Sequence, residues 1–166
     1  MNKTERYLRF LAQEAREHTG ASRCRLCAMV VYKNTPISIG RNQMKSHPIM
    51  AEYGRTEHHI FLHAEIDALL KASRELSPKE LKRSSLYVCR VFADGTMTTA
   101  KPCPGCTRCI KQYGIENVVW STYNGYSTSA HEELNASNEI YEAQKAINKH
   151  KIDRIQLSGQ TCSVFA

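Results

Sequence analysis

Several features that mark specialised proteins are missing from this chain. Its 166 residues show no repeat of fixed period and no segment of low complexity, which excludes repeat and low-complexity architectures. No apolar run is long enough to span a membrane. The charged, amphipathic residues 1–16 lack the apolar core of a signal peptide, so we expect a cytoplasmic protein without membrane contact. No linker divides the chain, and its length suits one full core, so we predict a single domain over residues 1–166.

Charge and cysteine content narrow the possibilities further. The formal net charge is +7, yet no long run of lysine and arginine occurs. Such a surface is compatible with nucleic acid, with nucleotide phosphates, or simply with solubility, and the composition leaves these three readings open. Seven cysteines in a chain without a secretion signal indicate reduced thiols and metal binding more than disulfides.

Two short motifs carry the chemistry. His63-Ala64-Glu65 supplies an imidazole and a carboxylate, and Cys103 and Cys106 of Pro-Cys-Pro-Gly-Cys supply two thiols. One nitrogen and two sulfur ligands leave an open fourth position on a tetrahedral zinc ion, where a water molecule can be activated. The carboxylate of Glu65 is not needed as a ligand and can act as an acid and base. Together the motifs match the H-x-E…P-C-x-x-C pattern of zinc-dependent nucleobase deaminases.

The spacing within each motif suggests where the metal lies. Residues two apart on a helix do not share a face, so His63 and Glu65 can serve one metal only beyond a helix N-terminus. We predict this helix over residues 61–76, with Ile66, Leu69, Leu70 and Ser73 on one stripe. Cys103 and Cys106 are three apart and can face one side at the start of a second helix that ends near residue 113. Helix N-termini favour thiolate over thiol.

The remaining pattern predicts a mixed sheet of four or five strands with helices on its faces. Residues 86–91 and 117–121 read as strands on either side of the second helix, which suggests a parallel crossover. A hairpin of strands 28–32 and 37–40 precedes a long connection over residues 42–59. Residues 77–78 read as a polar break and 122–126 as a polar loop. The other predicted elements are an amphipathic helix over 4–18 ended by Gly20, a helix over 130–150 and a short strand over 154–157.

The motifs resemble the cytidine deaminase superfamily, and in particular deoxycytidylate (dCMP) deaminase-like proteins, including phage-type members. The resemblance covers roughly residues 28–121 and includes Gly40-Arg41-Asn42, which is similar to a G-x-N motif of the family. It implies a three-layer α-β-α fold, one catalytic zinc ion, and a homo-oligomer. It also implies hydrolytic deamination of a cytosine nucleotide, dCMP to dUMP and ammonia, with zinc-bound hydroxide as nucleophile and Glu65 as proton shuttle. Asp67 departs from the asparagine of typical dCMP deaminases.

The resemblance and the residue types suggest how a nucleotide would be held. Asn42 is a candidate for hydrogen bonding to the sugar, or is a turn former. The backbone N–H of Ala64 can reach a base carbonyl, although an alanine also simply favours a helix. Tyr123 can stack on the base or pack at an edge.

A phosphate site is a further candidate on the long connection. Lys45, His47 and Arg55 offer cationic donors of the kind that a phosphate needs. The alternative is a solvated loop.

Three further cysteines are candidates for a second metal site. Cys24 and Cys27 form another C-x-x-C pair, and Cys109 extends the main motif, so these three with His47 could hold a second zinc ion. Alternatively they are small buried apolar residues.

Two other functions remain open at this point. A related enzyme could deaminate a base in tRNA or single-stranded DNA after flipping it out. A protein of another class could keep the fold and the zinc ion for binding alone, but such a protein would have no use for Glu65.

Overall fold

The computed structural model describes residues 1–19, 24–54, 56 and 59–129. The predicted helix end at Gly20 and the predicted elements over 130–150 and 154–157 lie outside these residues. The elements are α1 (Lys3–Glu17), β1 (Cys24–Tyr32), β2 (Thr35–Arg41), α2 (Met50–Tyr53), α3 (Ala64–Glu75), α4 (Pro78–Lys82), β3 (Ser85–Phe92), β4 (Met97–Thr98), α5 (Pro104–Tyr113), β5 (Asn117–Thr122) and β6 (Gly125–Ser129).

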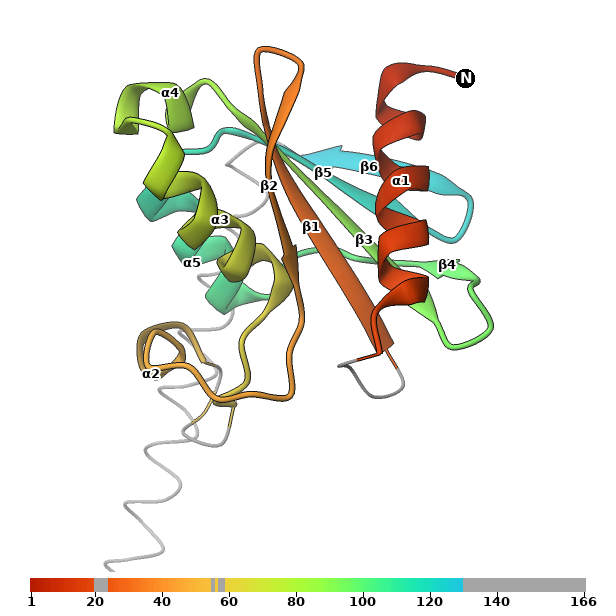
Figure 1. The fold of residues 1–166 in the computed structure, drawn as a ribbon, viewed down its shortest axis with the longest axis horizontal. Helices are drawn as coiled ribbons and strands as arrows, with labels where there is room; N and C mark the ends of the chain where they lie inside the picture. The colour runs from red at the N-terminus through yellow and green to blue at the C-terminus, as the bar shows by residue number, and fades with distance from the viewer. Residues whose placement is uncertain (20–23, 55, 57–58, 130–166) are drawn as a thin grey trace, which may run out of the picture.

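A mixed six-stranded sheet forms the centre of the molecule. The strand order is β2-β1-β3-β5-β6, and β4 pairs with the end of β3. The predicted hairpin of β1 and β2 is antiparallel, and β3 pairs parallel with β5 across α5, as predicted. Figure 1 shows α1 on one face of the sheet and α3, α4 and α5 on the other. The predicted three-layer α-β-α architecture is confirmed.

Strand alternation divides the core into two clusters. Ala28 and Val30 of β1 pack with α3 and α5, whereas Cys27 and Met29 pack with α1. Successive side chains of a strand point to opposite faces, so each strand serves both clusters. No helix among the described segments is long and apolar enough to cross a membrane.

Helix α3 begins at Ala64, three residues later than predicted. Residues before it pair with the preceding loop instead: Phe61 forms a bridge with Ser46, and the N–H of Leu62 donates to the carbonyl of Lys45 at 3.3 Å. His63 then has extended backbone angles, φ −80° and ψ 150°, as the residue before the helix. Long-range backbone pairing, which local periodicity does not contain, decides this boundary.

The buried face of α3 also differs from the predicted stripe. Ile66 and Leu69 are buried as expected, but Ser73 is exposed, and the buried set includes Ala64, Ala68 and Ala72. The alanines reflect a close approach to β2, because a side-chain carbon on Gly40 would lie 2.1 Å from the carbonyl oxygen of Ala64. Gly40 therefore brings the start of α3 against the sheet.

The sequence pattern missed four short elements, α2, α4, β4 and β6. The polar break at residues 77–78 opens α4, which begins with a capping box between Ser77 and Glu80. The polar loop after β5 is a tight turn followed by the edge strand β6. Its sequence, Gly-Tyr-Ser-Thr-Ser, has no apolar alternation, so the strand could not be read from hydrophobicity.

Candidate metal centre

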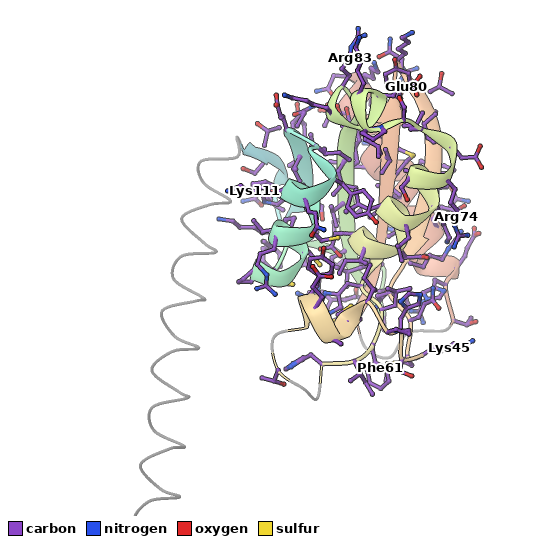
Figure 2. The ribbon with its side chains drawn as sticks, turned by 90° about the vertical axis from the view of Figure 1, so that its left-hand side faces the viewer. Lys45, Phe61, Arg74, Glu80, Arg83 and Lys111 are labelled. Atoms are coloured by element: carbon purple, nitrogen blue, oxygen red, sulfur yellow. The ribbon has the colours of Figure 1, made fainter. Side chains whose placement is uncertain are left out.

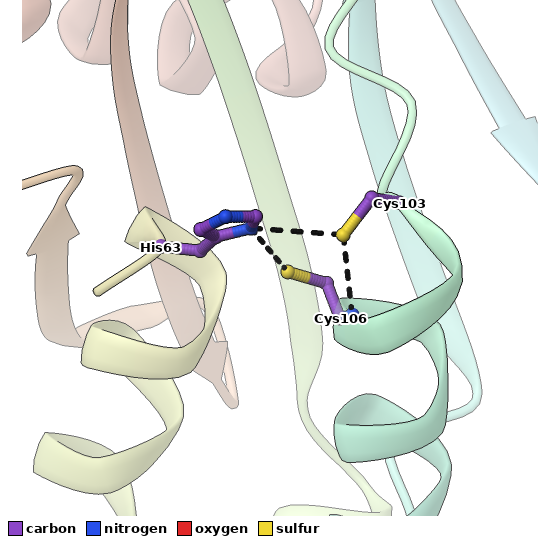
Figure 3. A group of neighbouring side chains, drawn as sticks. All are labelled: His63, Cys103 and Cys106. Atoms are coloured by element: carbon purple, nitrogen blue, oxygen red, sulfur yellow. Dashed lines mark hydrogen bonds between the residues drawn. The ribbon is translucent and has the colours of Figure 1, made fainter. Parts of the chain in front are cut away.

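His63, Cys103 and Cys106 come together between the starts of α3 and α5. Their ligand atoms all lie within 4.8 Å of one another, and no other such group of three or more potential ligands occurs in the described part of the chain. The Nδ1 atom of His63 is 3.2 Å from Sγ of Cys106 and 3.6 Å from Sγ of Cys103 (Figure 3). The sequence prediction that two helix N-termini meet at these side chains is therefore matched by the geometry.

The start of α5 positions both thiols. Cys103 precedes the helix and has extended backbone angles, Pro104 occupies an early helical position, and the N–H of Cys106 donates to Sγ of Cys103 at 3.5 Å. Proline suits this place because its missing N–H would have no intrahelical partner. Gly105 is required for packing, since a side-chain carbon there would lie 1.8 Å from the carbonyl oxygen of Tyr53 in α2.

Without metal, the two thiols share one proton unequally. The hydrogen bond from Cys106 and the nearby His63 together lower the pKa of Cys103 to about 4, although burial opposes the shift. The same hydrogen bond, together with burial, raises the pKa of Cys106 well above its usual value. The hydrogen bond to Cys103 raises the pKa of His63. The resulting charge pattern is a Cys103 thiolate held by two donors.

The donor set and its dimensions fit zinc. Zinc–sulfur bonds of about 2.3 Å and zinc–nitrogen bonds of about 2.0 Å place tetrahedral ligand atoms roughly 3.5–4 Å apart. The observed separations of 3.2 and 3.6 Å need only small adjustments to reach this. One imidazole and two thiolates leave a fourth position open, which is typical of catalytic rather than structural zinc sites.

Glu65 lies beside the ligand set and interacts with all three of its members. It follows His63 by two residues in the first turn of α3 and is only 3% exposed. Burial raises the pKa of its carboxyl group, and the charge of Cys103 raises it further, whereas His63 opposes the shift. A buried carboxyl group with a raised pKa beside a metal centre is suited to carrying protons near neutral pH.

A family model identifies this arrangement. The model of the cytidine and deoxycytidylate deaminase zinc-binding region matches residues 1–122. The chain belongs to this family. Zinc is thus the metal for which His63, Cys103 and Cys106 are positioned. No curated protein matches the chain in sequence.

Solved structures of several deaminases resemble the chain at low sequence identity. The cytidine deaminase from Burkholderia pseudomallei is 16% identical, with a TM-score of 0.55 over 81% of this chain and 96% of that one. A deaminase/reductase from Thermotoga maritima, the diaminohydroxyphosphoribosylaminopyrimidine deaminase, is 20% identical, with a TM-score of 0.52 over 82% of this chain and 34% of that one. The dCMP deaminase from cyanophage S-TIM5, in complex with dCMP and dUMP, is 20% identical, with a TM-score of 0.45 over 82% and 88%. The first two likenesses show a common fold.

Asn42 is bound to β1, and Ala64 directly follows the ligand His63. The amide of Asn42 binds β1, accepting from the N–H of Leu26 at 2.8 Å and donating to the carbonyl of Cys24 at 3.0 Å. A sugar hydroxyl would have to share these atoms, and the predicted contact stays a prediction. Ala64 is the first residue of α3, where a backbone N–H has no partner within the helix and where no side chain caps the helix start.

The other predicted contacts lie farther from the ligands. Lys45 and His47 line a groove of about 220 Å³ with Lys71 and Arg74 of α3. In Figure 2, Lys45 and Arg74 project on the side of α3 away from α5. Tyr123 lies at the turn between β5 and β6 with a side chain that is 66% exposed. Arg55 lies outside the described residues.

The second C-x-x-C pair does not form a metal site. Cys27 is buried in the cluster beneath α1, and Cys109 is buried in the cluster of α3 and α5, on the opposite face of the sheet. Sγ of Cys24 accepts a hydrogen bond from Arg90 at 2.8 Å. The alternative interpretation, that Cys27 and Cys109 are small buried apolar residues, agrees with the structure.

Proposed function

We propose that this protein is a zinc-dependent hydrolytic deaminase that converts dCMP to dUMP and ammonia. The observation that carries the proposal is Glu65, a buried carboxyl group beside the ligand set but not required by it. A site that served only to hold the fold together would gain nothing from this group, because burying a carboxyl group is unfavourable.

The residues of the chain divide the chemistry among them. When bound, zinc supplies a Lewis acid that makes water a competent nucleophile near neutral pH. Glu65 takes a proton from the attacking water and passes it to the ring nitrogen of cytosine. It then takes the proton of the hydroxyl group now on C4 and passes it to the amino group; the carbon–nitrogen bond breaks and ammonia leaves. In this proposal the N–H of Ala64, which has no partner within the helix, holds the carbonyl oxygen of the base. The dipole of α3 supports negative charge at this end.

The choice of a nucleotide rests on the resemblance to dCMP deaminases and on the net charge of +7. Guanidinium and ammonium groups favour a phosphate-bearing substrate over a nucleoside. The proposal includes contacts to this substrate from Asn42, Lys45, His47, Arg55 and Tyr123. It also includes assembly of the protein into a homo-oligomer.

Ammonia release from a substrate panel tests the proposal, with Glu65→Gln as the blank. The panel holds deoxycytidine, dCMP, dCTP, cytidine, adenosine, a tRNA and a single-stranded oligonucleotide. We expect turnover of dCMP well above that of deoxycytidine, and a loss of roughly 10²–10⁴-fold in Glu65→Gln because the proton carrier is gone. Turnover only on the polymers would move the function to nucleic-acid deamination.

A matched variant controls for effects on the helix. Glu75→Gln removes the same charge from an exposed position at the end of α3 and should leave turnover unchanged. Zinc content and the melting temperature should stay at the wild-type values in both variants. Undiminished activity in Glu65→Gln would disprove the mechanism.

A further inference from the structure

Arg90 of β3 lies on the same face of the sheet as the metal ligands. Leu86 and Val88 pack in the cluster that contains Cys106, whereas Tyr87 and Cys89 pack beneath α1. Because side chains alternate along a strand, Arg90 continues the first set. Its hydrogen bond to Cys24 agrees, since Leu26 and Ala28 of that strand also face α3 and α5.

The strand register places Arg90 beyond the level at which α3 starts. Val88 pairs with Ala28, and Ala28 pairs with Gly40, against which the first residue of α3 packs. Arg90 is two residues farther along β3, roughly 7 Å beyond this level. Figure 3 shows β3 passing behind His63 and the two cysteines and continuing beyond them. Arg90 therefore lies near the end of β3, on the face of the sheet that carries the metal ligands.

Asn42 binds the same part of β1 as Arg90. Arg90 pairs with Leu26 in the register, and the side chain of Asn42 accepts a hydrogen bond from the N–H of Leu26. The guanidinium of Arg90 donates to Sγ of Cys24, and the amide of Asn42 donates to the carbonyl oxygen of the same residue. Both polar side chains are therefore held at Cys24.

The positive charge of the Arg90 guanidinium is not balanced by an anionic side chain of the described residues. Its Nε atom is buried without a hydrogen-bond partner, and its one side-chain bond goes to the thiol of Cys24, a weak acceptor. No carboxylate of the residues that the structure describes forms an ion pair with it. A partly buried cation without an anion is unfavourable, so an anionic ligand group is its natural complement.

We propose that Arg90 binds the phosphate of the nucleotide substrate and so selects the nucleotide over the nucleoside. This inference rests on the proposed function, because it assumes that the cytosine ring lies at the metal. An arginine offers several donors to phosphate oxygens. Lys45, the alternative phosphate ligand, lines a groove whose α3 residues, Lys71 and Arg74, are on the side away from α5.

Calorimetry with dUMP and deoxyuridine, which differ by the phosphate, tests Arg90 directly. Losing a hydrogen bond between charged groups corresponds to a change in affinity of about 10-fold to 100-fold. We therefore expect Arg90→Gln to weaken dUMP binding by that factor and deoxyuridine binding by less than about 3-fold. Equal losses for both ligands would overturn the inference, as would a wild-type protein that binds both equally or binds neither.

Arg25→Gln is the matched control. Arg25 pairs with Val91 on the neighbouring position of the same two strands, so it faces α1, and it donates to the carbonyl of Arg16 at 2.5 Å. Its removal changes the net charge equally and should leave dUMP binding unchanged. Lys45→Gln is the competing variant, because Lys45 is the alternative phosphate ligand. If dUMP binding is weakened in Lys45→Gln but not in Arg90→Gln, the phosphate is bound in the groove beside α3 and not by Arg90.

A measurement on the wild-type protein covers the case in which Arg90→Gln does not fold. Inorganic phosphate should compete with dUMP but not with deoxyuridine, and absence of this difference would overturn the inference.

The proposed function and the role of Arg90 can fail independently of each other. If Arg90→Gln turns over dCMP with an unchanged KM, Arg90 does not bind the phosphate, but the protein is still a deaminase. If dUMP binding depends on Arg90 but the protein has no turnover, Arg90 binds the phosphate, but the proposed deaminase function is wrong.

Discussion

The spacing C-x-x-C occurs in β1 and again, extended to Cys109, in α5, and among the described residues only Cys103 and Cys106 build a metal centre. Cys103 and Cys106 stand at the start of α5, where residues three apart face the same side. Cys24 and Cys27 stand in β1, where an odd spacing sends the two side chains to opposite faces of the sheet. The same three-residue step therefore gives a chelating pair on a helix and two separated thiols on a strand.

The residues between the cysteines reinforce this difference. Gly105 lets the start of α5 pack against the backbone of Tyr53, and the corresponding residue of the other pair is Leu26, which packs against the core. His63 meets the helical pair because the start of α3 approaches the start of α5. In the strand pair, Cys27 has a pKa raised to about 12 by burial, so its thiol stays protonated.

Removing one cysteine from each pair should give the largest difference between the pairs, in zinc content and in activity. Cys103→Ala should lose its zinc, about one ion per chain, together with activity, because two remaining ligands do not hold the metal. Cys24→Ala should keep both. Elemental analysis of the purified proteins measures the zinc. A normal zinc content in Cys103→Ala would refute the ligand assignment.

The pH dependence of thiol alkylation in the metal-free protein tests the difference in pKa between Cys103 and Cys27. The pKa of Cys103, lowered to about 4, lies below the assay range, so its thiolate fraction is constant between pH 6 and pH 8. Its rate of reaction with iodoacetamide should change by less than about 2-fold over this range, whereas an ordinary thiol of pKa near 8.5 would lose roughly 100-fold on lowering the pH. Cys27 should stay unmodified at both values. Peptide mass spectrometry gives the rate for each cysteine, and a 100-fold fall at Cys103 would contradict its lowered pKa.

Gly105→Ala tests the packing that the helical pair requires. In an open helix the change would stabilise by up to about 1 kcal/mol. Here the added carbon would lie 1.8 Å from the carbonyl oxygen of Tyr53, so α2 and α5 must separate. We expect a loss of about 1–3 kcal/mol in the free energy of unfolding, measured by urea titration. A more stable variant would show that this contact is not needed.

Local sequence was sufficient for the ligand set, the helix start at Pro104 and the parallel crossover. The spacing within each motif and the turn chemistry beside it lie within a few positions, and the chemistry of zinc joins the two motifs although they are distant in the chain. The start of α3 was predicted three residues early, because residues 61 and 62 pair with residues 45 and 46, a contact that no local pattern contains. The edge strand β6 was missed because its residues are polar.

By itself, the sequence determined that His63, Cys103 and Cys106 form one ligand set with Glu65 beside it, because zinc chemistry demands those residue types. Only the tertiary structure decided which cysteines stay apart, which partners Asn42 has, and that Arg90 lies on the face of the sheet covered by α3 and α5. The alternation of β3 could have indicated the side of the sheet on which Arg90 lies. It could not indicate which helices cover that side, since this depends on how α3 and α5 pack across strands distant in the chain.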